Sequence, residues 1–288
     1  MIVAVVPSIR PEKMEEFRKA WQLLFKKHNV RLIIVWDGED PHVDDVWIGT
    51  NLKNNAEEIL GKDADLIYNF HSGVRNLGFA YVAKFLPEVE VLISLDDDTV
   101  PIGDPIADHL QTLEKHFPIS WFSTASEYTR GFPYGVRVEA ECVFSHGVWF
   151  GVPDFDAPTQ LVQGVHEIDF YKGAIPKGVY APICGMNIAF KRKILPYVYF
   201  APNSHNVGRF DDIFMGINLK KICDEKGWAI ATGFAQVQHD RASNVFKNLQ
   251  KEALGIELNE TFWQGDESHP YFKVYKEKYE RWKEFIGE

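Results

Sequence analysis

Three consecutive carboxylates, Asp96, Asp97 and Asp98, are the residues of this chain best suited to chemistry. They directly follow Val91 to Leu95, a run of β-branched and large apolar residues that predicts a buried strand ending at the acidic run. Like charges so close together repel one another unless a cation or hydrogen-bond donors neutralise them. Mg²⁺ and Mn²⁺ prefer oxygen ligands and often share them with substrate phosphates, so the run predicts a metal site, although a solvated turn or a helix cap also uses aspartates.

Asp96 and Asp98 are separated by one residue and therefore form the D-x-D pattern of glycosyltransferases that use nucleotide sugars. Such a short motif also occurs by chance. The predicted strand before it strengthens the hypothesis, because ligands of open α/β sheets bind at the carboxyl ends of strands.

A strand–helix–strand pattern opens the chain, with predicted strands at 2–6 and 31–36. A right-handed crossover makes these strands parallel, so both end at one crevice. Arg10 and Asp37 follow the two strands and are predicted to lie at its rim. Asp37 also fits the role of a turn residue before Gly38.

Arg75 lies in the first turn of a helix that is predicted to begin at Ser72. A positive charge there opposes the helix dipole, so Arg75 either meets an anion such as a phosphate or points into solvent. Further strands are predicted at 64–69 and 121–124.

Two more candidates lie late in the chain. Asp211 and Asp212 precede a predicted helix at 213–226, where they either act in catalysis or cap the helix. His239 follows a predicted strand at 228–237. An imidazole at a strand end can complete a carboxylate metal site, although a lone histidine is more often structural.

Residues 126–187 are rich in glycine, proline and aromatic residues and include TRGFPYGVR at 129–137. Such a stretch suits loops that form a sugar or acceptor pocket, or loops that merely connect elements. The last part of the chain, 246–288, reads as amphipathic helices, and no chemistry is assigned to it.

The composition is that of an ordinary globular protein, with 288 residues of which 45% are hydrophobic and 25% charged. The formal net charge of -10 argues against nucleic acid or an anionic membrane as a partner. Three scattered cysteines are too few for a disulfide framework or a zinc site. Because the sequence shows no leader and no membrane-spanning run, a reducing, cytoplasmic location is expected.

Several separated strings together resemble one family, the reversibly glycosylated polypeptides, also called UDP-arabinopyranose mutases, of glycosyltransferase family 75. In chain order these strings are SIRP at 8–11, WDG at 36–38, the Arg75-x-x-Gly78 helix, DDD at 96–98, RGFPYGVR at 130–137, SHGVWFGVPDFDAPTQL at 145–161, PICGMNIAF at 182–190, GRFDDIFMG at 208–216 and the segment from His239 to Asn244. They span nearly the whole chain, and the strings at 145–161 and 182–190 are far more specific than D-x-D.

The resemblance implies an α/β fold of the GT-A type, with a Rossmann-like, mostly parallel sheet flanked by helices. It implies one domain, 1–288, with a nucleotide-binding half (1–125), a sugar or acceptor half (126–245) and a helical tail (246–288). It also implies a UDP-sugar substrate, Mn²⁺ or Mg²⁺ as cofactor, and a homo-oligomer as a possible assembly. The chain departs from the plant proteins in its shorter ends and in the residues around Arg75, so the sugar stays open.

Site roles follow from the same resemblance. The implied metal ligands are Asp96, Asp98 and His239. Asp96 is also expected to contact the ribose, and the other residues expected to hold the nucleotide are Arg10, Asp37, Arg75 and Asp97. The implied catalytic residues are Arg130, Arg137, Asp211 and Asp212, with Arg130 as the position of reversible self-glycosylation. Because a guanidinium stays protonated and is a poor nucleophile, clamping a phosphate is an equal alternative for Arg130.

Three functions remain open on this basis. The first is a UDP-sugar mutase that releases UDP, holds the glycosyl group and returns it as the furanose. The second is a glycosyltransferase that passes sugar to itself or to a separate acceptor, as an α-1,4-glucan-protein synthase would. The third is a non-catalytic subunit that only binds nucleotide sugars.

Overall fold

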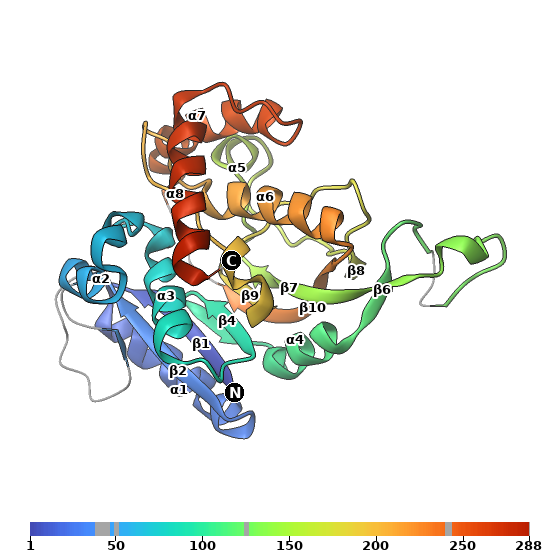
Figure 1. Cartoon of the computed structure of the whole chain (residues 1–288), viewed down its shortest axis with the longest axis horizontal. Coiled ribbons are helices and arrows are strands. Elements are labelled where there is room, and N and C mark those ends of the chain that lie inside the picture. The colour runs from blue at the N-terminus through green and yellow to red at the C-terminus, as the bar shows by residue number, and fades with distance from the viewer. Residues whose placement is uncertain (38–46, 49–51, 124–126, 240–243, 288) are drawn as a thin grey trace.

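The computed structural model describes residues 1–37, 47–48, 52–123, 127–239 and 244–287, with the backbone alone described at 47–48 and 52–55. Gly38 and residues 240–243, which belong to the matching strings, lie outside the described residues. The strands form one sheet in the order β3-β2-β1-β4-β9-β7-β10-β5, with β6 paired to β7 and β8 paired to β10 (Figure 1).

The strands are β1 Ile2–Ser8, β2 Val30–Trp36, β3 Trp47–Ile48, β4 Val91–Leu95, β5 Thr99–Pro101, β6 His116–Pro118, β7 Glu139–Gly151, β8 Gly173–Ala174, β9 Asn187–Lys191 and β10 Ala229–His239. The α-helices are α1 Pro11–Lys27, α2 Leu52–Leu60, α3 Arg75–Phe85, α4 Pro105–Glu114, α5 Ala157–Gln163, α6 Asp211–Lys226, α7 Val245–Phe262 and α8 Pro270–Ile286. Short 3₁₀ helices occur at Gly61–Leu66, Ser72–Val74, Tyr134–Val136 and Arg192–Tyr197.

The N-terminal half of the sheet is parallel, because β1 pairs in parallel with β2 and β4, and β2 pairs in parallel with β3. Strand β9 then runs antiparallel to β4 and β7, whereas β7 and β10 are parallel to each other. The expected α/β fold is confirmed, with a mixed sheet. Since β1, β2 and β4 run in one direction, their carboxyl ends meet at the same edge.

Helices cover both faces of this sheet. Along β1, Val3 and Val5 face a core shared with α2, α3, α6 and α8, whereas Ala4 and Val6 face a core shared with α1 and α4. Helix α3 packs tightly on β1, since a Cβ added to Gly78 would lie 2.4 Å from a methyl carbon of Val5. This close packing places the first turn of α3 at the carboxyl ends of the strands.

Strand β7 is the longest strand, with thirteen residues, and it lies in the stretch that was expected to form loops. That expectation is wrong for 139–151, because most of this segment is buried on both faces and therefore lacks alternation of polar and apolar residues. Gly151 at its carboxyl end pairs with His239 of β10, while Glu139 at its amino end pairs with β6. β7 therefore connects two distant regions of the molecule.

Two predicted strands are absent. Residues 64–66 belong to a 3₁₀ helix, with no strand at 67–69, and 121–123 form no strand, while Thr124 lies outside the described residues. The tail is helical as predicted, and Arg281 of α8 contacts Asp63 and Asp65 at 2.8 and 2.5 Å. None of the helices in the described ranges is long and apolar enough to cross a membrane.

Candidate active site

A cavity of about 700 Å³ opens at the carboxyl ends of β1, β2 and β4, where ligands of α/β sheets bind. Its walls come from the strand ends, the start of α3, the 203–209 loop and α7. The polar residues that line it are Ser8, Arg10, Asp37, His71, Ser72, Arg75, Asp96, Asp97, Asn203, Asn206, Arg209, Gln250 and Lys251. All five residues predicted to hold a nucleotide are in this set.

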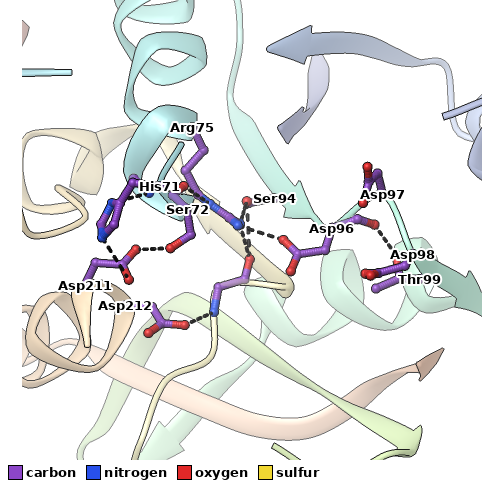
Figure 2. A network of polar contacts seen from close by, with 12 residues as sticks. His71, Ser72, Arg75, Ser94, Asp96, Asp97, Asp98, Thr99, Asp211 and Asp212 are labelled. Atoms are coloured by element: carbon purple, nitrogen blue, oxygen red, sulfur yellow. Dashed lines mark hydrogen bonds and ion pairs between the residues drawn. The ribbon is translucent and has the colours of Figure 1, made fainter. Parts of the chain in front are cut away.

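Asp96 is held by Arg75, as Figure 2 shows. The Asp96 Oδ1 atom accepts a bond of 2.7 Å from Arg75 Nη2. Asp96 is therefore the anion that compensates the positive charge at the start of α3. The alternative of a solvent-exposed arginine is excluded, because only 2% of the Arg75 side chain is exposed.

Arg75 uses most of its donors within the protein. Its Nε donates to Ser72 O at 2.9 Å, and its Nη1 donates to Ser94 Oγ and Gly185 O at 2.7 and 2.5 Å. Together with the bond to Asp96, these contacts use four of the five guanidinium N–H groups. Arg75 thus orients Asp96 first, and one of its N–H groups has no acceptor among the described residues.

Arg10 neutralises the other two carboxylates of the triplet. It forms an ion pair with Asp97, and its Nη2 lies 3.0 Å from Asp98 Oδ2. Asp97, only 5% exposed, also accepts a 2.5 Å bond from Ser8 Oγ. Burial raises the pKa of Asp97, and the bonds from Arg10 and Ser8 oppose that rise. Asp97 therefore serves mainly to fix Arg10 at the rim of the cavity.

His239 and Asp98 come together at the ends of β10 and β4, with 3.7 Å between Nε2 and Oδ1. Two ligands that each lie about 2.1 Å from a shared Mg²⁺ are separated by at most about 4.2 Å, so this pair fits a divalent ion. Asp96 adds a carboxylate one residue away. The donor chemistry fits Mg²⁺ or Mn²⁺, although within the described residues no group of three such ligands is already gathered around one point.

Replacing His239 by alanine tests its predicted role as a ligand. In the presence of UDP, we expect the affinity for Mn²⁺ to fall by about 10-fold or more, because even residues that only orient a ligand contribute 10- to 100-fold. Isothermal titration with Mn²⁺ measures the change. Binding as tight as in the wild type would make His239 structural, held by its contact to Val152 O at 3.5 Å.

Asp37 lies at the end of β2 and is 5% exposed. It accepts a bond from the Phe70 backbone N–H through Oδ2, while Oδ1 is buried and has no hydrogen-bond partner among the described residues. Desolvation raises its pKa to about 6, against the backbone hydrogen bonds that lower it. Asp37 is therefore more than a turn residue, because it leaves a buried acceptor to be satisfied.

Asp211 and Asp212 begin α6 but do not cap it, because its N-cap is Phe210. Asp211, 3% exposed, accepts a bond from Ser72 Oγ and lies 3.6 Å from His71 Nε2. Asp212 accepts a 3.0 Å bond from the Gly185 backbone N–H. Burial and the neighbouring charge of Asp211 raise the pKa of Asp212 well above its usual range. Figure 2 places this pair on the opposite side of Arg75 from Asp96.

Sequence reasoning missed the wall that the tail contributes. Glu252 of α7, 3% exposed, accepts bonds of 2.7 Å from Arg209 Nε and from the Ala157 backbone N–H. This contact fixes Arg209, which lines the cavity with Gln250 and Lys251. The string GRFDDIFMG includes Arg209, so the sequence did contain a signal for this cation. Roles were predicted only for the two aspartates of that string.

Arg130 and Arg137 are not brought to this cavity. They lie between β6 and β7 in a projection that we call the arm, residues 119–123 and 127–138, which Figure 1 shows extending away from α2 and α3. Arg137 lies 3.9 Å from the Tyr134 ring centre and donates to Phe132 O at 3.1 Å, so it holds the arm together. Arg130 is exposed and forms no ion pair with another described residue.

Comparison with known proteins extends over nearly the whole chain. A family model described as Reversibly glycosylated polypeptide matches residues 2–274. UDP-arabinopyranose mutase 3 of Arabidopsis thaliana is 34% identical over 293 residues, which cover 93% of this chain and 76% of the relative. Probable UDP-arabinopyranose mutase 1 of Pisum sativum is 34% identical over 294 residues, which cover 94% of this chain and 76% of that one.

Solved structures give weaker likenesses. The catalytic domain of Drosophila β1,4-galactosyltransferase 7 with xylobiose aligns at a TM-score of 0.37 and 11% identity, over 80% of this chain and 63% of that one. A mutant of that enzyme with manganese, UDP-Gal and xylobiose aligns at 0.36 and 10%, over 80% and 64%.

The family match and the plant relatives agree with the family that the strings in the sequence indicate. The chain belongs to the reversibly glycosylated polypeptide family.

Proposed function

We propose that this protein is a metal-dependent UDP-sugar mutase that interconverts the pyranose and furanose forms of UDP-arabinose and reversibly glycosylates itself at Arg130. The relatives named UDP-arabinopyranose mutase support the reaction. The structural observation that carries the substrate assignment is the Oδ1 of Asp37, which has no hydrogen-bond partner among the described residues and lies in the same cavity as Arg10, Arg75 and Asp96. A nucleoside diphosphate needs both kinds of group.

Asp37 suits uracil, because the N3–H of the base is a donor for the buried carboxylate oxygen. Cytosine lacks that hydrogen, and a site built for a hydrogen bond rejects analogues that cannot make it. UDP is therefore preferred to CDP. Arg10, the remaining hydrogen of Arg75 and Arg209 supply the positive charge that a diphosphate needs.

This assignment gives a pH dependence with a definite sign. Because the pKa of Asp37 is raised to about 6, ionisation of this carboxyl is incomplete at pH 5, and we expect the affinity for uridine to increase as pH rises through 6. In Asp37→Asn the dependence disappears. Calorimetric titration with uridine, which has no phosphate to titrate, measures both; equal slopes in the two proteins would remove Asp37 from base recognition.

Stability changes in the opposite direction over the same range. The native state binds the Asp37 proton more tightly than the unfolded state does, so this group's contribution to the free energy of unfolding falls as pH rises from about 4 to about 6. Toward pH 6, the affinity for uridine is therefore expected to rise while the contribution of Asp37 to the free energy of unfolding falls.

The reacting end of the substrate is assigned to the other side of Arg75. Cleavage of the bond between C1 and the diphosphate leaves negative charge on UDP and positive charge on the sugar. Arg10 and Arg209 stabilise the leaving diphosphate, and Asp211 or Asp212 faces the sugar. Asp96, Asp98 and His239 would hold a divalent cation, which lowers the charge on the leaving group.

The test is to incubate pure protein with UDP-arabinopyranose and Mn²⁺, then to analyse the nucleotide sugars by chromatography and the protein by intact mass. The furanose isomer together with a pentose adduct that excess UDP removes is the expected result. Sugar on protein or acceptor with net release of UDP would instead identify a transferase, and binding without reaction would identify a silent subunit. A reducing, cytoplasmic location is part of the proposal and suits the three buried free cysteines, Cys142, Cys184 and Cys223.

A further inference from the structure

Arg130 is separated from the cavity of its own chain by the length of β7. The arm joins β7 at Glu139, whereas the other end, Gly151, pairs with His239 beside the aspartates. Thirteen residues at about 3.3 Å each span about 40 Å along the strand, far beyond the reach of a side chain. Figure 1 shows that the arm extends farther outward instead of folding back over the sheet.

The arm has the features of a surface that docks on another molecule. Tyr134 and Val138 are 84% and 79% exposed, and Trp121 at its base is 47% exposed. The contact of Arg137 with Tyr134 and Phe132 gives the segment a defined shape. Apolar side chains presented together on a projection are expected at an interface.

Charge points to the occupant. The described part of the arm contains two arginines and one glutamate, Glu127, so it is cationic in a chain of net charge -10. The site has more carboxylates than cations: six carboxylates, Asp37, Asp96, Asp97, Asp98, Asp211 and Asp212, against four cations, Arg10, Arg75, Arg209 and Lys251. A cationic arm and an acidic site on the same chain are complementary between two copies.

We propose that the arm docks on a second copy of this chain and places Arg130 in that copy's site, so that each site is completed by its partner. The inference rests on the proposed self-glycosylation and assigns where it happens. The bond between C1 of the sugar and the β-phosphate oxygen breaks, and its electron pair leaves on UDP. A bond forms between C1 and a guanidinium nitrogen of Arg130, whose displaced proton passes to the partner's Asp212. Excess UDP reverses the step.

Docking also resolves the poor nucleophilicity of a free arginine. On its own chain Arg130 forms no ion pair with another described residue, so nothing there accepts its proton. In the partner's site it meets carboxylates, including the one whose pKa is raised by burial and by a neighbouring charge. In its ionised form, a carboxylate of raised pKa is a stronger base than an ordinary aspartate.

The experiment uses two inactive chains. Asp98→Asn keeps Arg130 but damages the site, and Arg130→Lys keeps the site but lacks the acceptor. Each variant is purified alone. The two are also co-expressed with different affinity tags, and the mixed complex is isolated by two successive affinity steps, one for each tag. After incubation with UDP-arabinopyranose and Mn²⁺, we expect no adduct on either variant alone. In the mixed complex, we expect a pentose only on the Asp98→Asn chain, at Arg130.

The outcomes separate this inference from the proposed function. Docking in trans is overturned if wild type forms the adduct at a rate per chain that does not depend on protein concentration, and if the two variants form no mixed complex or form one without adduct. This result leaves the proposed self-glycosylation standing. No adduct on wild type refutes self-glycosylation and this inference with it, whereas isomerisation still tests the mutase.

A surface variant gives a second measurement. Val138→Glu on the arm is expected to lower labelling and self-association at least 10-fold while leaving the affinity for UDP unchanged. The matched control is Val162→Glu on α5, a valine that is 86% exposed and outside the arm. Equal labelling by the two variants would contradict the arm as the docking surface.

Discussion

Asp98→Asn lowers kcat/KM for the UDP-sugar by about 100-fold or more in our expectation, because residues that only support a metal ligand already contribute 10- to 100-fold. The substitution preserves shape, and the relief of repulsion within the triplet is offset by loss of the ion pair with Arg10, so the free energy of unfolding is expected to change by less than about 1 kcal/mol. Steady-state kinetics over a series of Mn²⁺ concentrations and urea unfolding measure the two effects.

The matched control is Asp169→Asn, an exposed aspartate outside the site. It changes the net charge by the same amount and should leave both measurements unchanged. Turnover of Asp98→Asn close to the wild-type value at every Mn²⁺ concentration would show that the triplet does not act through a metal.

Arg75→Met should give the largest loss of stability, about 3 kcal/mol, because removing one partner of a buried charged network costs 3–5 kcal/mol. The methionine fills part of the volume but leaves Ser94 Oγ without a donor, Gly185 O with only the 3.4 Å bond from Ser94 Oγ, and Asp96 without its cation. Urea unfolding measures the change in the free energy of unfolding.

Arg18→Met is the control, since the Arg18 side chain on α1 is 31% exposed and lies 3.8 Å from Glu15, and loss of such a partly exposed ion pair is expected to change stability by no more than about 0.5 kcal/mol. Arg75→Lys keeps the charge but not the planar fork, so it should fall between the two. A loss below 1 kcal/mol in Arg75→Met would mean that the network is not important for stability.

The elements that hold the site were predictable where their signals are local. Strands β1, β2 and β4 and helices α1, α3 and α6 follow from periodic apolar residues, and parallel crossover then places Arg10, Asp37 and Asp96 at one edge. Asp96 and Arg75 were each identified, but their pairing was not, because they are 21 residues apart and meet only after α3 packs on β1.

Other features had no local signal. Strand β7 is buried on both faces and contains His146 and Gly147, so its sequence resembles a loop more than a strand. Lys251 and Glu252 resemble the solvated face of an amphipathic helix, yet they close the cavity. The distance from Arg130 to the aspartates depends on the length and direction of β7 and therefore could not be predicted from the motif.

The role of Glu252 has a consequence for synthesis of the chain. The sheet is complete once β10 ends at His239, but the cavity wall that contains Arg209 is fixed only when α7 supplies Glu252. During translation, the ribosome therefore releases the strands of the sheet before it releases the residue that fixes this wall of the cavity. If the cavity binds UDP as proposed, the nucleotide meets this wall only after α7 has been made, so a nascent or C-terminally shortened chain gains less stability from its ligand.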